Sequence, residues 1–173
     1  MSPENNTAKV LSKRHWKFIV IENALGPMFT NVGINGGITW LVFRSFEGGS
    51  IDVVSIKMDI LSTSFLLPFI TVLLANAVVG KQVRSEKLHK LPLEKGSKNK
   101  GLTKNVFVRA SVLGIIAVLV IGFPTVWLMN SNGEGIPFMP YVYFKGIWAG
   151  VFALLVSPIA GWWALQKHSL AEN

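Results

Sequence analysis

The chain has 173 residues, of which 50% are hydrophobic and only 15% are charged, and its mean hydropathy is positive. This composition is typical of an integral membrane protein and argues against a soluble globular domain. The absence of cysteine excludes disulfide bonds, a thiolate metal site and a cysteine nucleophile.

Residues 1–17 form a polar tail that ends in several basic side chains, and residues 18–43 form the first predicted membrane span. About 20 mainly apolar residues are enough to cross the hydrocarbon core. This span is nevertheless unusually polar, because it contains Glu22, three asparagines and five glycine or proline residues. A helix with this content cannot face lipid on every side, so one face is expected to meet protein or water.

Two neighbouring stripes run along this predicted helix, one polar and one of small residues. Small residues let a second backbone approach closely, and asparagine side chains can hydrogen-bond across such a contact. The polar stripe consists of Asn23, Pro27, Asn31 and Asn35. The small stripe consists of Gly26, Thr30, Gly33 and Gly37. Because proline lacks a backbone donor, we expect a kink at Pro27. The stripes predict either a packing seam or the lining of a polar path.

A second predicted span covers residues 58–80 and completes a first transmembrane hairpin over residues 18–80. It opens with Asp59 and has a polar side that includes Thr63. Residues 81–105 form a basic loop, in which eight Lys or Arg side chains outnumber two Glu.

A second hairpin is predicted over residues 106–165, with spans at 106–129 and 141–165, and residues 166–173 form a C-terminal tail. Each remaining predicted span contains one proline at which a kink or packing irregularity is expected. These prolines are Pro68, Pro124 and Pro158. The predicted fold is an all-α integral membrane protein, a four-transmembrane-helix bundle.

The basic side chains are concentrated in the N-terminal tail and in the 81–105 loop. The positive-inside rule then places both termini and this loop in the cytoplasm, with the protein in the plasma (inner) membrane. The loop is interpreted as a topology determinant that also attracts anionic lipids, and not as a nucleic-acid site.

The two halves show a weak correspondence at an offset of 87 residues. Trp40-Leu41 falls on Trp127-Leu128, and Glu47-Gly48 falls on Glu134-Gly135. With one residue inserted, Lys57 meets Lys145. If this reflects a duplication, the chain consists of two tandem hairpins in the same orientation, related by an axis along the membrane normal.

The same offset places Glu22 opposite Arg109, each close to the cytoplasmic edge of its span. Charges inside membranes usually pair with one another or face water. We therefore weigh three hypotheses for Glu22: an intramembrane ion pair with Arg109, a carboxylate that snorkels to the nearby interface, and a proton- or cation-coupling carboxylate.

No catalytic motif is found, and the three histidines lie in the tails and the basic loop, so no metal site and no cofactor is predicted. Four spans with an acidic residue in the first resemble the small multidrug-resistance transporters in outline. This chain departs from that family in its length, in its long basic loop and in the position of Glu22.

Two functions remain open at this point. The first is a small transporter- or channel-like protein with a polar path along the first two helices. Its candidate residues are Glu22, Asn23, Asn31, Asn35, Asp59 and Thr63. The second is a non-transporting membrane subunit or assembly factor whose polar seams bind a membrane protein partner or another copy of the chain.

The topology is testable with reporter fusions after residues 50, 95, 135 and 173. The charge distribution predicts that these report outside, inside, outside and inside. An external report from the fusion at 95 would overturn the orientation.

Overall fold

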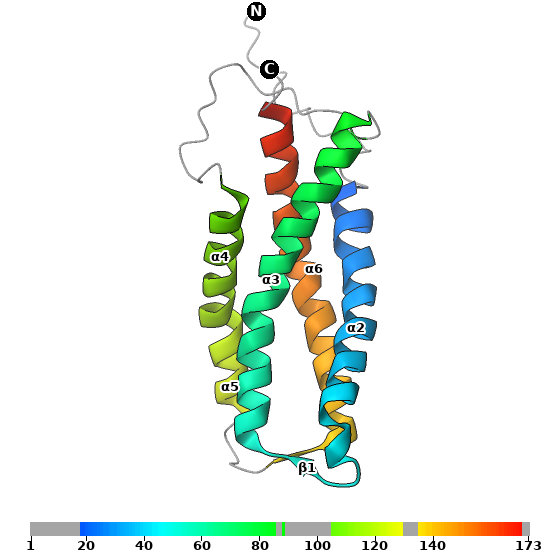
Figure 1. The fold of residues 1–173 in the computed structure, drawn as a ribbon, viewed down its shortest axis with the longest axis vertical. Coiled ribbons are helices and arrows are strands. Elements are labelled where there is room, and N and C mark those ends of the chain that lie inside the picture. Colours follow the sequence, from blue (N-terminus) through cyan, green and yellow to red (C-terminus); the bar gives the residue numbers. More distant parts are fainter. Residues whose placement is uncertain (1–17, 86–87, 89–104, 130–134, 171–173) are drawn as a thin grey trace, which may run out of the picture.

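The computed structural model describes residues 18–85, 88, 105–129 and 135–170. Within these residues the chain forms four helices packed as a bundle, which confirms the predicted all-α architecture (Figure 1). The predictions for the N-terminal tail, most of the basic loop and the last three residues lie outside the described residues.

The first helix consists of two parts with different hydrogen-bond patterns. A π-helix, η2, spans Phe18–Leu25 and continues directly into α2 at Gly26–Phe43. Pro27 is the second residue of α2. A π-turn shifts backbone pairing from i+4 to i+5, so a carbonyl can bypass the donor that proline lacks. The irregularity therefore lies where the sequence predicted a kink.

The same arrangement recurs in the third helix of the bundle. It consists of α4 at Val106–Ala117, the π-helix η4 at Val118–Gly122 and α5 at Phe123–Met129. Here too the proline, Pro124, is the second residue after the π-segment. The other two prolines, Pro68 and Pro158, lie inside helices that continue past them.

The second and fourth helices, α3 at Val53–Arg84 and α6 at Phe138–Leu170, are longer than predicted at both ends. The early start of α3 is explained by Asp52, whose Oδ1 accepts a hydrogen bond from the backbone N of Ser55 at 2.9 Å. This N-cap bond satisfies a free donor of the first turn. Hydrogen bonding from the side chain of Ser55 and then from its backbone N–H lowers the pKa of Asp52.

A short 3₁₀ turn at Arg44–Phe46 and a two-stranded sheet close one end of the bundle. Strand β1 (Ser50–Ile51) pairs antiparallel with β2 (Ile136–Pro137), just before α3 and α6 begin. The sequence did not predict this sheet, because each strand has only two residues and carries no detectable alternation.

The helices α3 and α6 run in the same direction from this sheet and pack against each other (Figure 1). The first helix packs mainly on α6, and α4 packs mainly on α3, so these two helices lie at opposite edges of the bundle. The larger hydrophobic core lies between α3, α4 and α6, and a smaller one lies beside the sheet.

Close packing of α2 on α6 depends on glycines that the small stripe did not include. A Cβ atom at Gly146 would lie 3.0 Å from the carbonyl oxygen of Val32 and 3.5 Å from the Cα of Gly36. Gly33 and Gly37 are instead exposed, and a Cβ at either would meet nothing within 4 Å. Within this chain, the seam therefore lies one residue away from the predicted pair.

Among the described residues, three helices are long and apolar enough to cross a membrane by length and composition: Val53–Arg84, Val106–Met129 and Phe138–Ser169. This supports an integral membrane protein. The first helix runs alongside them (Figure 1). Its α2 part contains Asn31 and Asn35.

The glycine seam gives a stability prediction. In Gly150→Leu, the new Cβ would overlap Cγ2 of Val32 and would lie 3.1 Å from the carbonyl oxygen of Met28. Thermal unfolding in detergent should show a loss of about 1–3 kcal/mol. Gly37→Leu is the control and should stay within about 0.5 kcal/mol of the parent. Equal losses of unfolding free energy in the two variants would show that α2 turns a different face toward α6.

Candidate functional site

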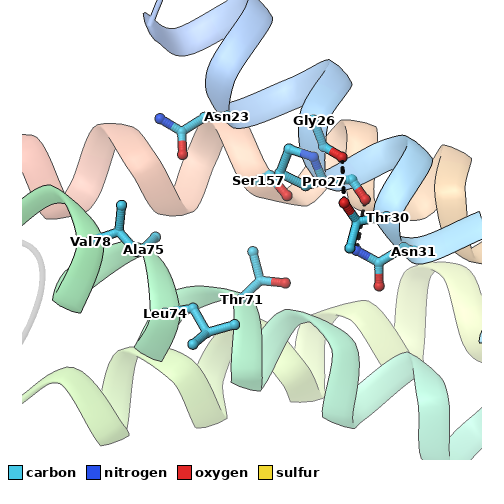
Figure 2. Close-up of a pocket in the computed structure, with 10 residues that line it drawn as sticks. All are labelled: Asn23, Gly26, Pro27, Thr30, Asn31, Thr71, Leu74, Ala75, Val78 and Ser157. Carbon is cyan, nitrogen blue, oxygen red and sulfur yellow. Dashed lines mark hydrogen bonds between the residues drawn. The ribbon is translucent and has the colours of Figure 1, made fainter. Parts of the chain in front are cut away.

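A cavity of about 390 Å³ lies between the first helix, α3 and α6 (Figure 2). It lies at the junction of η2 and α2, where the helix changes its hydrogen-bond pattern. Its volume falls within the range of about 300–1,000 Å³ that is usual for small-molecule sites. The lining residues are Asn23, Gly26, Pro27, Thr30, Asn31, Thr71, Leu74, Ala75, Val78 and Ser157.

Most polar groups of the cavity wall are already satisfied by the backbone of their own helix. Thr30 Oγ1 donates to the carbonyl of Gly26 at 3.0 Å, and Asn31 Nδ2 donates to the carbonyl of Pro27 at 2.9 Å. On α3, Thr71 Oγ1 donates to the carbonyl of Leu67 at 2.7 Å. These bonds leave the cavity surface polar in places but without charge.

Ser157 on α6 is the exception. Its side chain is only 2% exposed, and its hydroxyl has no hydrogen-bond partner among the described residues. Helical Ser and Thr hydroxyls commonly bond the carbonyl four residues back, as Ser64 and Thr125 do here at 2.7 Å. A buried hydroxyl without a partner is unfavourable by about 1–3 kcal/mol, so Ser157 calls for an explanation.

Asn23 also lines the cavity and packs directly on the backbone of α6 at Gly161. A Cβ at Gly161 would lie 2.9 Å from Cγ of Asn23 and 3.0 Å from its Nδ2. Only glycine at position 161 gives the Asn23 amide this space. In Figure 2, Asn23, Pro27 and Asn31 lie on the side of the first helix, and Thr71 and Val78 extend from α3.

A second polar site joins α3 to α6 nearer the sheet. Lys145 Nζ lies 2.7 Å from Asp59 Oδ2 and also donates to the carbonyl of Asp59 at 3.1 Å. Tyr141 OH donates to the same Oδ2 at 2.5 Å. Lys145 is fully buried, whereas the Asp59 side chain is 26% exposed. The carboxylate thus receives two donors from successive turns of α6.

The Lys145 ammonium also lies 5.4 Å from the centre of the Trp148 ring, a distance suited to a cation–π contact. Trp148 Nε1 in turn donates to Thr125 Oγ1 on α5 at 3.2 Å. The ion pair between α3 and α6 is therefore connected to the third helix as well.

The structure separates the six predicted path residues. Asn23 and Asn31 line the cavity, and Asn35 donates to the Asn31 side chain at 3.1 Å, next to it. Asp59 belongs to the ion pair, and Thr63 is half-buried on α3 and is not among the cavity residues. The Glu22 side chain lies outside the described part of the chain.

The predicted ion pair between Glu22 and Arg109 involves helices at opposite edges of the bundle. The η2 segment packs on α6 and α2, whereas α4, which carries Arg109, packs on α3 (Figure 1). Because the Glu22 side chain is not described, the pair remains a prediction, but this arrangement of the helices disfavours it.

The sequence reasoning missed Ser157, Tyr141 and Lys145 as site residues. For the ion pair a signal existed, since Asp59 and Lys145 are opposite charges just inside the ends of two predicted spans that start on the same side of the membrane. The sequence gives no comparable signal for Ser157, because the absence of a hydrogen bond to its hydroxyl is visible only in the folded structure.

Among the described residues, no three His, Asp or Glu side chains converge, so neither site offers a metal ion its usual ligand set. Comparison of the chain with protein-family models, with curated proteins and with solved structures finds no match.

The ion pair predicts large effects of single substitutions. Asp59→Asn should cost about 3–5 kcal/mol in thermal unfolding, because it leaves a buried ammonium without its counter-charge. Tyr141→Phe removes one hydrogen bond to a charged group and should cost about 1.5–3 kcal/mol. Asp52→Asn is the matched control, since asparagine caps a helix about as well as aspartate. An Asp59 variant as stable as the control would contradict the ion pair.

Proposed function

We propose that this chain is a small transporter-like membrane protein that binds an uncharged ligand in the cavity beside the π-to-α junction of the first helix. The observation that carries the proposal is the position of the cavity, which combines a helix irregularity with a buried, unpartnered hydroxyl. The polar path expected along the first two helices becomes, in this proposal, a site between the first helix, α3 and α6.

The change from a π-helix to an α-helix supports the proposal on physical grounds. Within a bilayer, irregular backbone is tolerated only where it is covered by protein or lines a cavity. Single π-helical turns inside helices occur frequently at functional sites. Here η2 meets α2 at the cavity wall, and Pro27 is one of the lining residues.

The arrangement of the hairpins gives a second line of support. Each hairpin contributes one helix to the central pair, and its other helix packs on the central helix of the opposite hairpin. The sheet register, Ser50 with Pro137 and Ile51 with Ile136, is symmetric for an offset of 86 residues. The same offset relates Asp59 to Lys145. We therefore infer two parallel repeats around an axis through the sheet and the ion pair, as in some transporter folds.

The proposed orientation follows the distribution of basic residues. With the 81–105 loop in the cytoplasm, the ion pair lies toward the outer side of the plasma membrane, and the Asn23 end of the cavity lies toward the cytoplasm. Contacts of the basic loop with anionic lipids belong to the same proposal.

One observation favours the alternative of a non-transporting subunit or assembly factor. The outward face of α2 combines the exposed Gly33 and Gly37 with large exposed side chains such as Phe29 and Ile38. Such a face could pack against a membrane partner or a second copy of the chain. It is a weaker basis than the cavity, because apolar exposure is also what a lipid-facing helix requires.

A flux experiment with matched variants tests the proposal. The protein is reconstituted into liposomes and exposed to panels of uncharged and charged solutes. Val78→Trp should fill the cavity and lower any protein-dependent flux about ten-fold or more. Ile70→Trp, at a similarly exposed position of α3 outside the lining, should leave the flux unchanged. Flux equal to that of empty vesicles for every class of solute would contradict transport and favour the alternative.

A further inference from the structure

We infer that the cavity accepts an uncharged amphiphile, an apolar chain with one small hydrogen-bonding head, and that this ligand enters from the bilayer between α2 and α3. This inference rests on the ligand-binding function proposed for the cavity and specifies the class of ligand. It follows from the charge of the lining, from the position of the opening and from the depth of Ser157.

The lining selects against a charged head. None of the described lining residues is ionisable, and Thr30, Asn31 and Thr71 direct their donors to backbone carbonyls. A charged group brought to this depth would lose its hydration without gaining a counter-charge. The hydroxyl of Ser157, by contrast, lacks a partner within the described part of the chain, and a hydroxyl or carbonyl head could supply one.

The opening of the cavity faces the region that lipid occupies. The helices α2 and α3 make little direct contact with each other, because α2 packs mainly on α6 and α3 packs mainly on α6 and α4. Leu74 and Val78 on α3 line the cavity and are 60% and 51% exposed. Figure 2 shows them on the α3 side, opposite the first helix. A ligand that is already dissolved in the bilayer can therefore enter without crossing an aqueous channel.

The depth of Ser157 excludes an ordinary phospholipid head. At 1.5 Å per residue, Ser157 lies about 28 Å from the start of α6 and about 20 Å from its end. The hydrocarbon core is about 30 Å thick, so this hydroxyl lies well inside it. A phospholipid keeps its charged head at the interface, whereas a free chain with a small uncharged head can bring that head to Ser157.

A photolabelling experiment tests this inference on the full chain in nanodiscs of zwitterionic phospholipid. The probe is dodecanol that carries a diazirine in its chain, and labelled positions are read by mass spectrometry. We expect saturable labelling of cavity-lining residues of α2, α3 and α6. Excess dodecanol should compete, and the same chain with a trimethylammonium head should not.

Two variants separate the head contact from general lipid contact. Ser157→Ala should lower saturable labelling about five-fold, the factor expected for loss of one typical hydrogen bond, without lowering the melting temperature. Ser62→Ala, an exposed hydroxyl on α3 outside the lining, should change neither. Unchanged labelling in Ser157→Ala would overturn the role assigned to that hydroxyl.

Two further outcomes distinguish this inference from the proposed function. If glycerol competes for the cavity and dodecanol does not, the ligand class is wrong, while the cavity remains a binding site. If labelling is unsaturable and spread evenly over the lipid-facing residues, the inference fails. The flux experiment then decides the proposed function separately.

Discussion

The buried ion pair between Asp59 and Lys145 constrains the rest of the structure. Lys145 is fully buried, and a buried ammonium is tolerated only with a close counter-charge and satisfied donors. Both conditions are met only while α3 and α6 stay side by side, with Tyr141 holding the carboxylate and Trp148 covering the ammonium. This fixes the rotation of the two central helices, and the other two helices pack around them.

The cavity is a consequence of this arrangement. Because α3 already packs on α6 and α4, the first helix contacts mainly α6, where Gly146 and Gly150 allow a close approach. Its π-segment and Pro27 then lie opposite α3 without packing on it, and the space between them is the cavity. A change of helix type, a buried hydroxyl and the space between the first helix and α3 thus coincide at one place, which is why the proposed function is assigned there.

The bundle and three of its spans could be predicted from hydropathy, and the break at Pro27 from the chemistry of proline. The side-chain contacts between the helices could not be predicted, because the sequence indicates how deep a residue lies in the membrane but not which way its helix is rotated. Glu22 and Arg109 were matched by depth alone, and that pair stays a prediction, whereas the equally matched Asp59 and Lys145 were overlooked. The predicted seam of Gly33 and Gly37 also lies one residue away from the observed contacts at Val32 and Gly36. Ser157 could be recognised only from a missing bond in three dimensions.

The central claim is that Asp59 and Lys145 act as one unit, and a double-mutant cycle tests it most directly. Asp59→Asn, Lys145→Met and the double variant are compared by thermal unfolding in the same detergent. Because the double variant leaves no unpaired buried charge, the account predicts that it loses about 2–3 kcal/mol less than the sum of the single losses. Additive losses would show that the two side chains do not meet, and would contradict the account.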